Sequence, residues 1–107
     1  MYARLTTVYV KLDKIDEAIN IYEEYVIPAA NAQPGCCGCY LLTDRSTGKG
    51  IVMTMWETRY YAGASIQNGY YQAQLNRFST MFVAKPATEG YEISTQQVKT
   101  KRFSLTT

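Results

Sequence analysis

Apolar positions follow two different spacings along the chain. Residues 2–11 (YARLTTVYVK) are rich in β-branched and aromatic side chains and carry bulk on both faces, which is typical of a half-buried strand. The segments Cys36–Thr43 and Ile51–Trp56 share this character and flank a short polar connection in which Gly48 is available for a positive φ. We therefore predict an antiparallel hairpin in the middle of the chain and a further strand over Tyr91–Val98.

Two other stretches follow helical spacing. After Asp13, whose carboxylate is placed to cap a first turn, apolar residues recur on one stripe until Pro28, which is expected to kink or end the helix. The second helical pattern starts after Thr58, a candidate N-cap, and is interrupted at Asn68 and Gly69. We predict two helical segments in this second stretch, Arg59–Gln67 and Tyr70–Phe82.

The order of these elements is βαββαβ, which predicts an α+β, ferredoxin-like fold with a four-stranded antiparallel sheet and two helices on one face. The other face of that sheet would carry large apolar groups such as Met53 and Met55. A soluble monomer rarely exposes such a face, so the pattern predicts a homodimer. Residues 1–98 are expected to form one domain, and residues 99–107 a polar tail or strand extension.

Composition and charge exclude several classes of function. The chain has 107 residues, a net charge of +2 and no histidine, so nothing favours nucleic acid or an anionic membrane as a partner. No apolar run is long enough for a membrane span, and the first residues do not resemble a signal peptide. We therefore expect a cytoplasmic protein.

The three cysteines lie together at Cys36, Cys37 and Cys39. An odd number on one segment is a poor disulfide framework, and adjacent strand residues point to opposite faces, so no metal site is predicted. The cysteines are expected to be small buried residues in a reducing compartment, and a redox-active thiol is the alternative.

Short strings across residues 2–98 carry a resemblance to a known family: Ile27-Pro28-Ala29-Ala30, Gln33-Pro34-Gly35, Leu41-Leu42-Thr43-Asp44-Arg45, Trp56-Glu57, Ala64-Ser65, Gly69-Tyr70-Tyr71 and Tyr91-Glu92. The chain resembles the antibiotic biosynthesis monooxygenase-like (ABM) family of dimeric α/β barrels. The resemblance implies one of two activities, cofactor-independent oxidation of aromatic phenols to quinones or haem degradation. Haem-degrading relatives hold iron through a histidine of the second helix, so a chain without histidine is not expected to use haem, and no cofactor is expected.

The remaining activity needs flat walls and groups that stabilise a substrate oxyanion. The candidate catalytic residues are Trp56, Asn68, Tyr60 and Arg77. The candidate substrate-binding residues are Tyr71, Tyr61, Phe78 and Phe82. In this hypothesis Trp56 and Tyr71 form walls, and Tyr60, Asn68 or Arg77 stabilises the oxyanion. Each also has a structural interpretation: Trp56 as a core or interface anchor, for example, and Asn68 as a helix terminator.

Three functional hypotheses follow. The leading one is a cofactor-independent monooxygenase acting on a small flat aromatic or apolar molecule. The alternative is a non-catalytic, stress-responsive or regulatory dimer that binds such a molecule. A third is an assembly role in which residues 99–107 recruit a partner.

Overall fold

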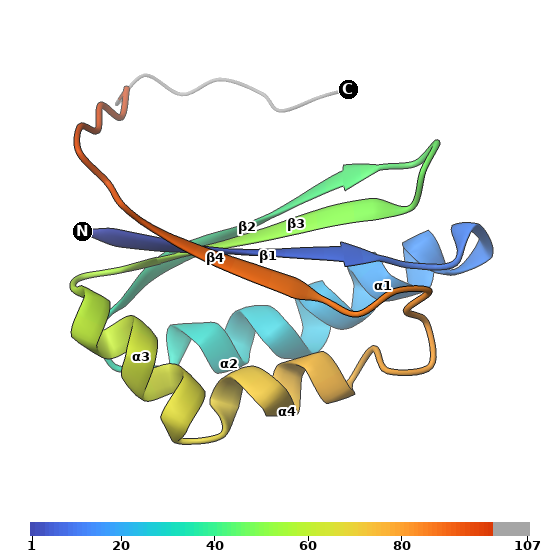
Figure 1. Cartoon of the computed structure of the whole chain (residues 1–107), viewed down its shortest axis with the longest axis horizontal. Coiled ribbons are helices and arrows are strands. Elements are labelled where there is room, and N and C mark those ends of the chain that lie inside the picture. The colour runs from blue at the N-terminus through green and yellow to red at the C-terminus, as the bar shows by residue number, and fades with distance from the viewer. Residues whose placement is uncertain (100–107) are drawn as a thin grey trace.

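The computed structural model describes residues 1–99 of the chain as a twisted sheet with a helical layer on one face (Figure 1). The four strands are β1 (Tyr2–Tyr9), β2 (Cys36–Asp44), β3 (Lys49–Trp56) and β4 (Ala87–Glu92). Their order is β2-β3-β1-β4, and every neighbouring pair is antiparallel. The ferredoxin-like fold predicted from the element order is confirmed. The tail expected over residues 99–107 lies, except for Lys99, outside the described residues.

The central hairpin forms where the sequence predicts it. In the turn, the Asp44 carboxylate accepts hydrogen bonds from the backbone N–H of Ser46 (3.0 Å) and from its hydroxyl (2.7 Å). Gly48 has a φ of 78°, and a Cβ there would lie 2.3 Å from the Val10 carbonyl oxygen, so only glycine fits. At its other end β2 bulges between Cys36 and Gly38, which leaves Cys37 exposed. The expectation that all three cysteines are buried is therefore wrong for Cys37, while Cys36 and Cys39 are half-buried.

The first helical stretch continues past Pro28, the residue expected to kink or end it. It comprises a 3-10 turn (Leu12–Lys14), α1 (Ile15–Ile21), a π-helical turn (Tyr22–Val26) and α2 (Ile27–Asn31). The expected Asp13 cap is absent, since neither helical start has a side-chain capping bond. Pro28 does not end the helix. The preceding turn widens so that the Ile27 N–H donates to the Tyr22 carbonyl, and the chain stays helical through the proline.

The second helical stretch begins and breaks as predicted. The Thr58 hydroxyl accepts from the Tyr61 N–H (3.4 Å) at the start of α3 (Arg59–Gln67), and Gly69 turns the chain with a φ of 89°. However, α4 covers only Tyr70–Asn76 and does not reach Phe82. The backbone beyond α4 forms hydrogen bonds with the end of β1 and the residues after it instead of continuing the helix. The Lys11 N–H donates to the Met81 carbonyl (2.9 Å), and the Val83 N–H donates to the Tyr9 carbonyl (2.9 Å).

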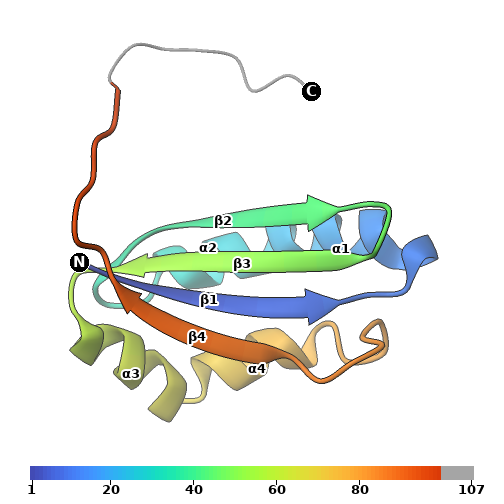
Figure 2. The same ribbon diagram turned by 45° about the horizontal axis from the view of Figure 1, so that its top comes forward.

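The last strand was predicted too late in the chain: β4 is Ala87–Glu92, not Tyr91–Val98. Its limits are set by β1, along which it pairs from Thr7↔Ala87 to Tyr2↔Glu92. After the Ile93 N–H donates to the Met1 carbonyl (2.9 Å), the chain passes the start of β1 and loses its neighbouring strand. Figure 2 shows residues 93–99 leaving the sheet at this point.

The two faces of the sheet have different surroundings. All helices lie against the face that carries Arg4, Thr6, Val8, Val52 and Thr54 (Figure 1). No described element covers the opposite face, which we call the open face of the sheet (Figure 2). It carries large apolar side chains. Three of these, Tyr40, Leu42 and Tyr91, are 55%, 51% and 54% exposed.

Candidate functional site

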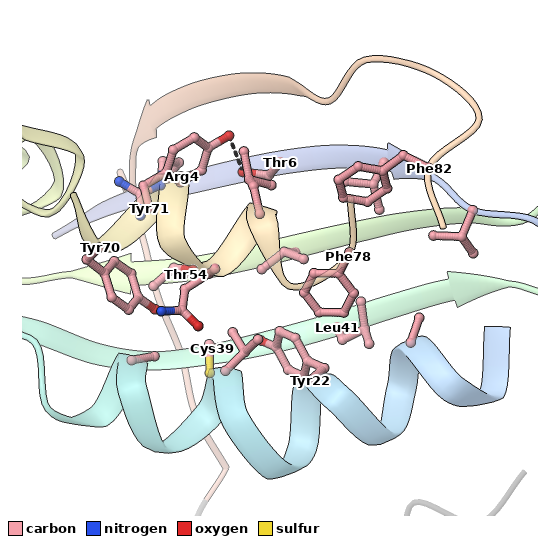
Figure 3. Close-up of a pocket in the computed structure, with 18 residues that line it drawn as sticks. Arg4, Thr6, Tyr22, Cys39, Leu41, Thr54, Tyr70, Tyr71, Phe78 and Phe82 are labelled. Atoms are coloured by element: carbon pink, nitrogen blue, oxygen red, sulfur yellow. Dashed lines mark hydrogen bonds between the residues drawn. The ribbon is translucent and has the colours of Figure 1, made fainter. Parts of the chain in front are cut away.

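A small cavity of about 80 Å³ lies between the sheet and the helical layer (Figure 3). Its floor comes from β1, β2 and β3, one wall from the first helical stretch and the other from α4 and the turn that follows it. The lining residues are Arg4, Thr6, Val8, Val10, Ala18, Tyr22, Val26, Ala30, Cys39, Leu41, Val52, Thr54, Tyr70, Tyr71, Gln74, Leu75, Phe78 and Phe82. The lining is apolar at the Phe82 end, and polar groups gather near Arg4.

Arg4 is the one charged residue in this lining, and it is only 5% exposed. Its Nη1 donates to the Ala62 carbonyl (2.9 Å) and to the Ser65 hydroxyl (2.8 Å), both on α3. Its guanidinium carbon lies 5.2 Å from the Trp56 ring centre and 4.8 Å from the Tyr71 ring centre, within cation–π range. Burial lowers the pKa of the guanidinium, and it remains protonated at neutral pH because its ordinary pKa is so high.

Three tyrosines, Tyr22, Tyr70 and Tyr71, line the cavity. The Tyr71 hydroxyl accepts from the Thr6 hydroxyl (3.5 Å) and shares a hydrogen bond with Thr88. Burial raises the pKa of Tyr70 to about 12. Burial also raises the pKa of Tyr22, helped by the neighbouring Cys39 thiol, and the buried Tyr22 hydroxyl has no nitrogen or oxygen partner among the described residues. The phenols of Tyr22 and Tyr70 therefore stay protonated at neutral pH.

Three of the residues predicted from the sequence line the cavity: Tyr71, Phe78 and Phe82. They come from α4 and the turn after it, and their side chains point toward the sheet (Figure 3).

The other five predicted residues lie outside the lining. Trp56 is fully buried under Arg4. The side-chain Oδ1 of Asn68 accepts from the Tyr70 N–H (2.9 Å), and its Nδ2 donates to the Gln33 side-chain oxygen (3.2 Å). Asn68 therefore joins α4 to the turn before β2. Tyr60 is 76% exposed, with Tyr61 against its edge. Arg77 stacks on Tyr25 at 5.0 Å.

Sequence reasoning missed Arg4 and Tyr70 at the polar end, and also Tyr22, which lines the cavity beside Cys39. The available signal was a lone arginine on the face of the first strand that also carries Val8 and Val10. A charged residue inside a half-buried strand is a functional candidate, because burying a charge is costly unless something compensates it.

No group of three metal-ligating side chains occurs among residues 1–99. None of the helices in that range has the length and apolar character needed to cross a bilayer.

Comparison with known proteins identifies the family. The family model for antibiotic biosynthesis monooxygenase matches residues 1–76. The chain belongs to the ABM family. An uncharacterized protein of Mycobacterium tuberculosis is 35% identical to this ABM chain over 94 residues, which are 88% of the chain and 41% of the relative. The chain thus spans about two-fifths of the length of that curated relative.

Solved structures share the fold of this ABM chain at low sequence identity. A monooxygenase of Streptomyces coelicolor, in complex with the ligand Nanaomycin D, superposes with a TM-score of 0.74 at 11% identity and covers 92% of each chain. A Nitrosomonas europaea protein of unknown function gives a TM-score of 0.73 at 15% identity, covering 94% of this chain and 95% of its own. At these identities the likeness concerns the fold alone.

Proposed function

We propose that the cavity beneath α4 binds a small, flat, largely apolar molecule and that this molecule reacts there directly with molecular oxygen. The observation that carries the proposal is the cavity itself, which has Tyr71, Phe78 and Phe82 around an apolar interior and one buried cation at its end. Membership of the ABM family and the monooxygenase name of a structural neighbour support the same reaction class.

The proposed reaction needs no cofactor because the substrate supplies the electrons. An activated CH₂ group of a phenolic substrate loses a proton, and the resulting anion passes electrons to oxygen. A C–O bond forms, the O–O bond breaks, and the second oxygen atom leaves as water. The balance is R₂CH₂ + O₂ → R₂C=O + H₂O.

The described side chains have three kinds of role in this proposal. Tyr71 and Phe78 hold the flat face of the substrate. Trp56 positions Arg4 by lying under its guanidinium. Asn68 positions Tyr70, the first residue of α4, by accepting its backbone N–H.

Cavity size limits which substrates enter without movement. A dry cavity of about 150 Å³ holds benzene, whereas this one is about 80 Å³. A phenolic ring therefore requires α4 to move away from the sheet. We propose that α4 moves as a unit about Gly69, whose φ of 89° already separates it from α3.

One observation favours a second candidate, a protein that binds the molecule without converting it. The 18 described lining residues include no aspartate, glutamate or histidine, and burial raises the pKa values of Tyr22 and Tyr70. The described lining therefore offers no carboxylate or imidazole as a general base, which binding alone does not require.

Oxygen consumption separates the two candidates. Phenols and anthrones are first screened by thermal shift, and each compound that binds is then tested in an oxygen electrode. Oxygen uptake with release of a quinone supports the monooxygenase. Stabilisation without uptake supports the binder, and stabilisation by no compound contradicts both.

A matched pair of variants tests whether binding and oxygen uptake take place in the cavity. Leu75→Trp fills the cavity and is expected to abolish both binding and uptake, because Leu75 lines it. Ala73→Trp, on the exposed side of the same helix, is expected to change neither. Equal activity of the two variants would place the reaction elsewhere.

We also propose that the chain forms a homodimer through the open face of the sheet. Leu5, Met53 and Met55 lie on that face between the exposed Tyr40 and Tyr91. A soluble protein rarely leaves so many large apolar groups together in water, and a second copy presents the matching surface.

A further inference from the structure

The cation at the end of the cavity has no anionic partner in the described chain. Its hydrogen-bond acceptors, the Ala62 carbonyl and the Ser65 hydroxyl, are both neutral. The ion pairs among residues 1–99 are Lys14–Glu17 and Arg45–Asp16, and neither includes Arg4. Burying a charge without a counter-charge is expensive, so the fold retains a cost at this position that a bound anion would offset.

Glu89 is the acidic residue that shares a surface with Arg4, since both border a groove between α3 and β4. Its carboxylate accepts a hydrogen bond from the Tyr91 hydroxyl (2.9 Å) and makes no ion pair with Arg4. The chain itself therefore does not neutralise Arg4 within the described residues.

The unused donors of Arg4 have a specific geometry. A guanidinium carries five N–H groups, and the hydrogen bonds that Arg4 makes to described residues all come from Nη1. Nε–H and one N–H of Nη2 point the same way along the free edge. This parallel pair is the fork that binds a carboxylate or another anionic oxygen with two hydrogen bonds.

We propose that Arg4 makes the cavity selective for flat monoanions, which place a carboxylate or phenolate oxygen on its Nε–Nη2 edge and their apolar body toward Phe78 and Phe82. One cation among 18 lining residues matches one negative charge. The inference rests on the proposed ligand cavity. It adds a chemical consequence, because a buried cation lowers the pKa of a bound phenol and holds it in the electron-rich form that oxygen attacks.

The test compares anions with neutral molecules of similar shape. Isothermal titration calorimetry measures the binding of benzoate against neutral benzamide, and of 4-nitrophenolate, at a pH above its pKa, against neutral 4-nitroanisole. The structure predicts at least about tenfold tighter binding of each anion, in line with hydrogen bonds to charged groups. The pair with the larger ratio of anion affinity to neutral-ligand affinity shows whether the site prefers a carboxylate or a phenolate.

Variants of Arg4 assign the effect to its side chain. Arg4→Gln is expected to remove the preference for benzoate over benzamide. Arg4→Lys keeps the charge and loses the fork, so it is expected to retain part of the preference. Trp56 is the only tryptophan and lies under Arg4, so its fluorescence should respond to benzoate in the wild type.

The outcomes separate this inference from the proposed function. Equal binding of benzoate and benzamide by the wild-type chain overturns the role of Arg4 and leaves the cavity proposal standing. Binding of neither ligand overturns both. Unchanged benzoate affinity in Leu75→Trp also overturns the inference, because the anion would then bind outside the cavity. The wild-type comparison decides the inference even if an Arg4 variant fails to fold.

Discussion

Trp56 illustrates how one side chain supports the site without lining it. It is 0% exposed, and its indole N–H has no hydrogen-bond partner among the described residues. Its ring lies under the Arg4 guanidinium, so the indole supports the guanidinium from below and helps to set its position at the end of the cavity. The sequence predicted a residue at the site, whereas the structure places it one layer below.

Trp56→Ala is therefore expected to destabilise the fold and not simply to alter a ligand wall. Loss of a fully buried indole should lower the free energy of unfolding by about 3–5 kcal/mol, measured by urea denaturation. Trp56→Phe retains most of the packing and removes the unpaired N–H, so its cost should be clearly smaller. A cost below about 1 kcal/mol for Trp56→Ala would contradict the burial described above.

Tyr70 gives a prediction about alkaline pH. Its pKa is raised to about 12, so the folded chain keeps a proton that the unfolded chain loses near pH 10. The resulting contribution to stability is complete below about pH 10 and is lost as the pH rises through about 12. In urea titrations across this range the wild type should lose more stability than Tyr70→Phe. Parallel losses in the two proteins would mean that Tyr70 is not buried.

The site residues that sequence reasoning found are those whose signal is local. Tyr71 and Phe78 follow helical spacing and therefore face the sheet together. Arg4 was missed because its environment is built by distant residues, Ala62 and Ser65, which lie 58 and 61 positions away. No local spacing predicts that a charged side chain will find its acceptors there.

The break between α3 and α4 is the feature that lets one helix cover the cavity independently of the other. Gly69 has a φ of 89°, and nothing lies within 4 Å of a Cβ built on it. Gly63, within α3, has equally open surroundings and no positive φ. The two glycines therefore differ in backbone conformation and not in space.

Alanine at these positions should have opposite effects. Gly69→Ala is expected to destabilise by about 1–2 kcal/mol, because a Cβ disfavours the left-handed conformation. Gly63→Ala is expected to stabilise by about 1 kcal/mol through helix propensity. Thermal melts of the two variants measure both effects. A stabilising Gly69→Ala would show that the break is not maintained by a left-handed glycine.

The ends of a helix or strand could be predicted where a residue at that end marks them. They could not be predicted where pairing with a distant strand decides them. Thr58 and Gly69 mark the ends of α3 in the sequence and in the structure. Residues 87–90 (ATEG) have weak strand propensity and become strand through pairing with β1, so the predicted fourth strand was displaced. The helix likewise continues through Pro28 because a π-helical turn precedes it.

The fold as a whole was predictable because the order of strands and helices restricts the possible topologies. The cavity was not, because its small volume depends on how α4 and the first helical stretch meet the sheet. The apolar open face was predictable in part. The alternation of its side chains is visible in the sequence, whereas the second copy that would cover them remains our proposal.

The dimer proposal makes a prediction about mass in solution. Analytical ultracentrifugation at micromolar concentration should give twice the mass of one chain. Met53→Lys, which places a charge within the open face, should yield folded monomers because a buried unpaired lysine disfavours the interface. Glu24→Lys on the exposed side of the helical layer is the control and should remain dimeric. A monomeric wild type would contradict the proposal.

A crystal structure of the chain with bound benzoate is the decisive measurement for the Arg4 site. Electron density is expected between α4 and the sheet, with the carboxylate on Nε and Nη2 of Arg4 and the ring beside Tyr71 and Phe78. Benzoate bound only at another surface, with the cavity empty and Arg4 unchanged, would contradict this expectation.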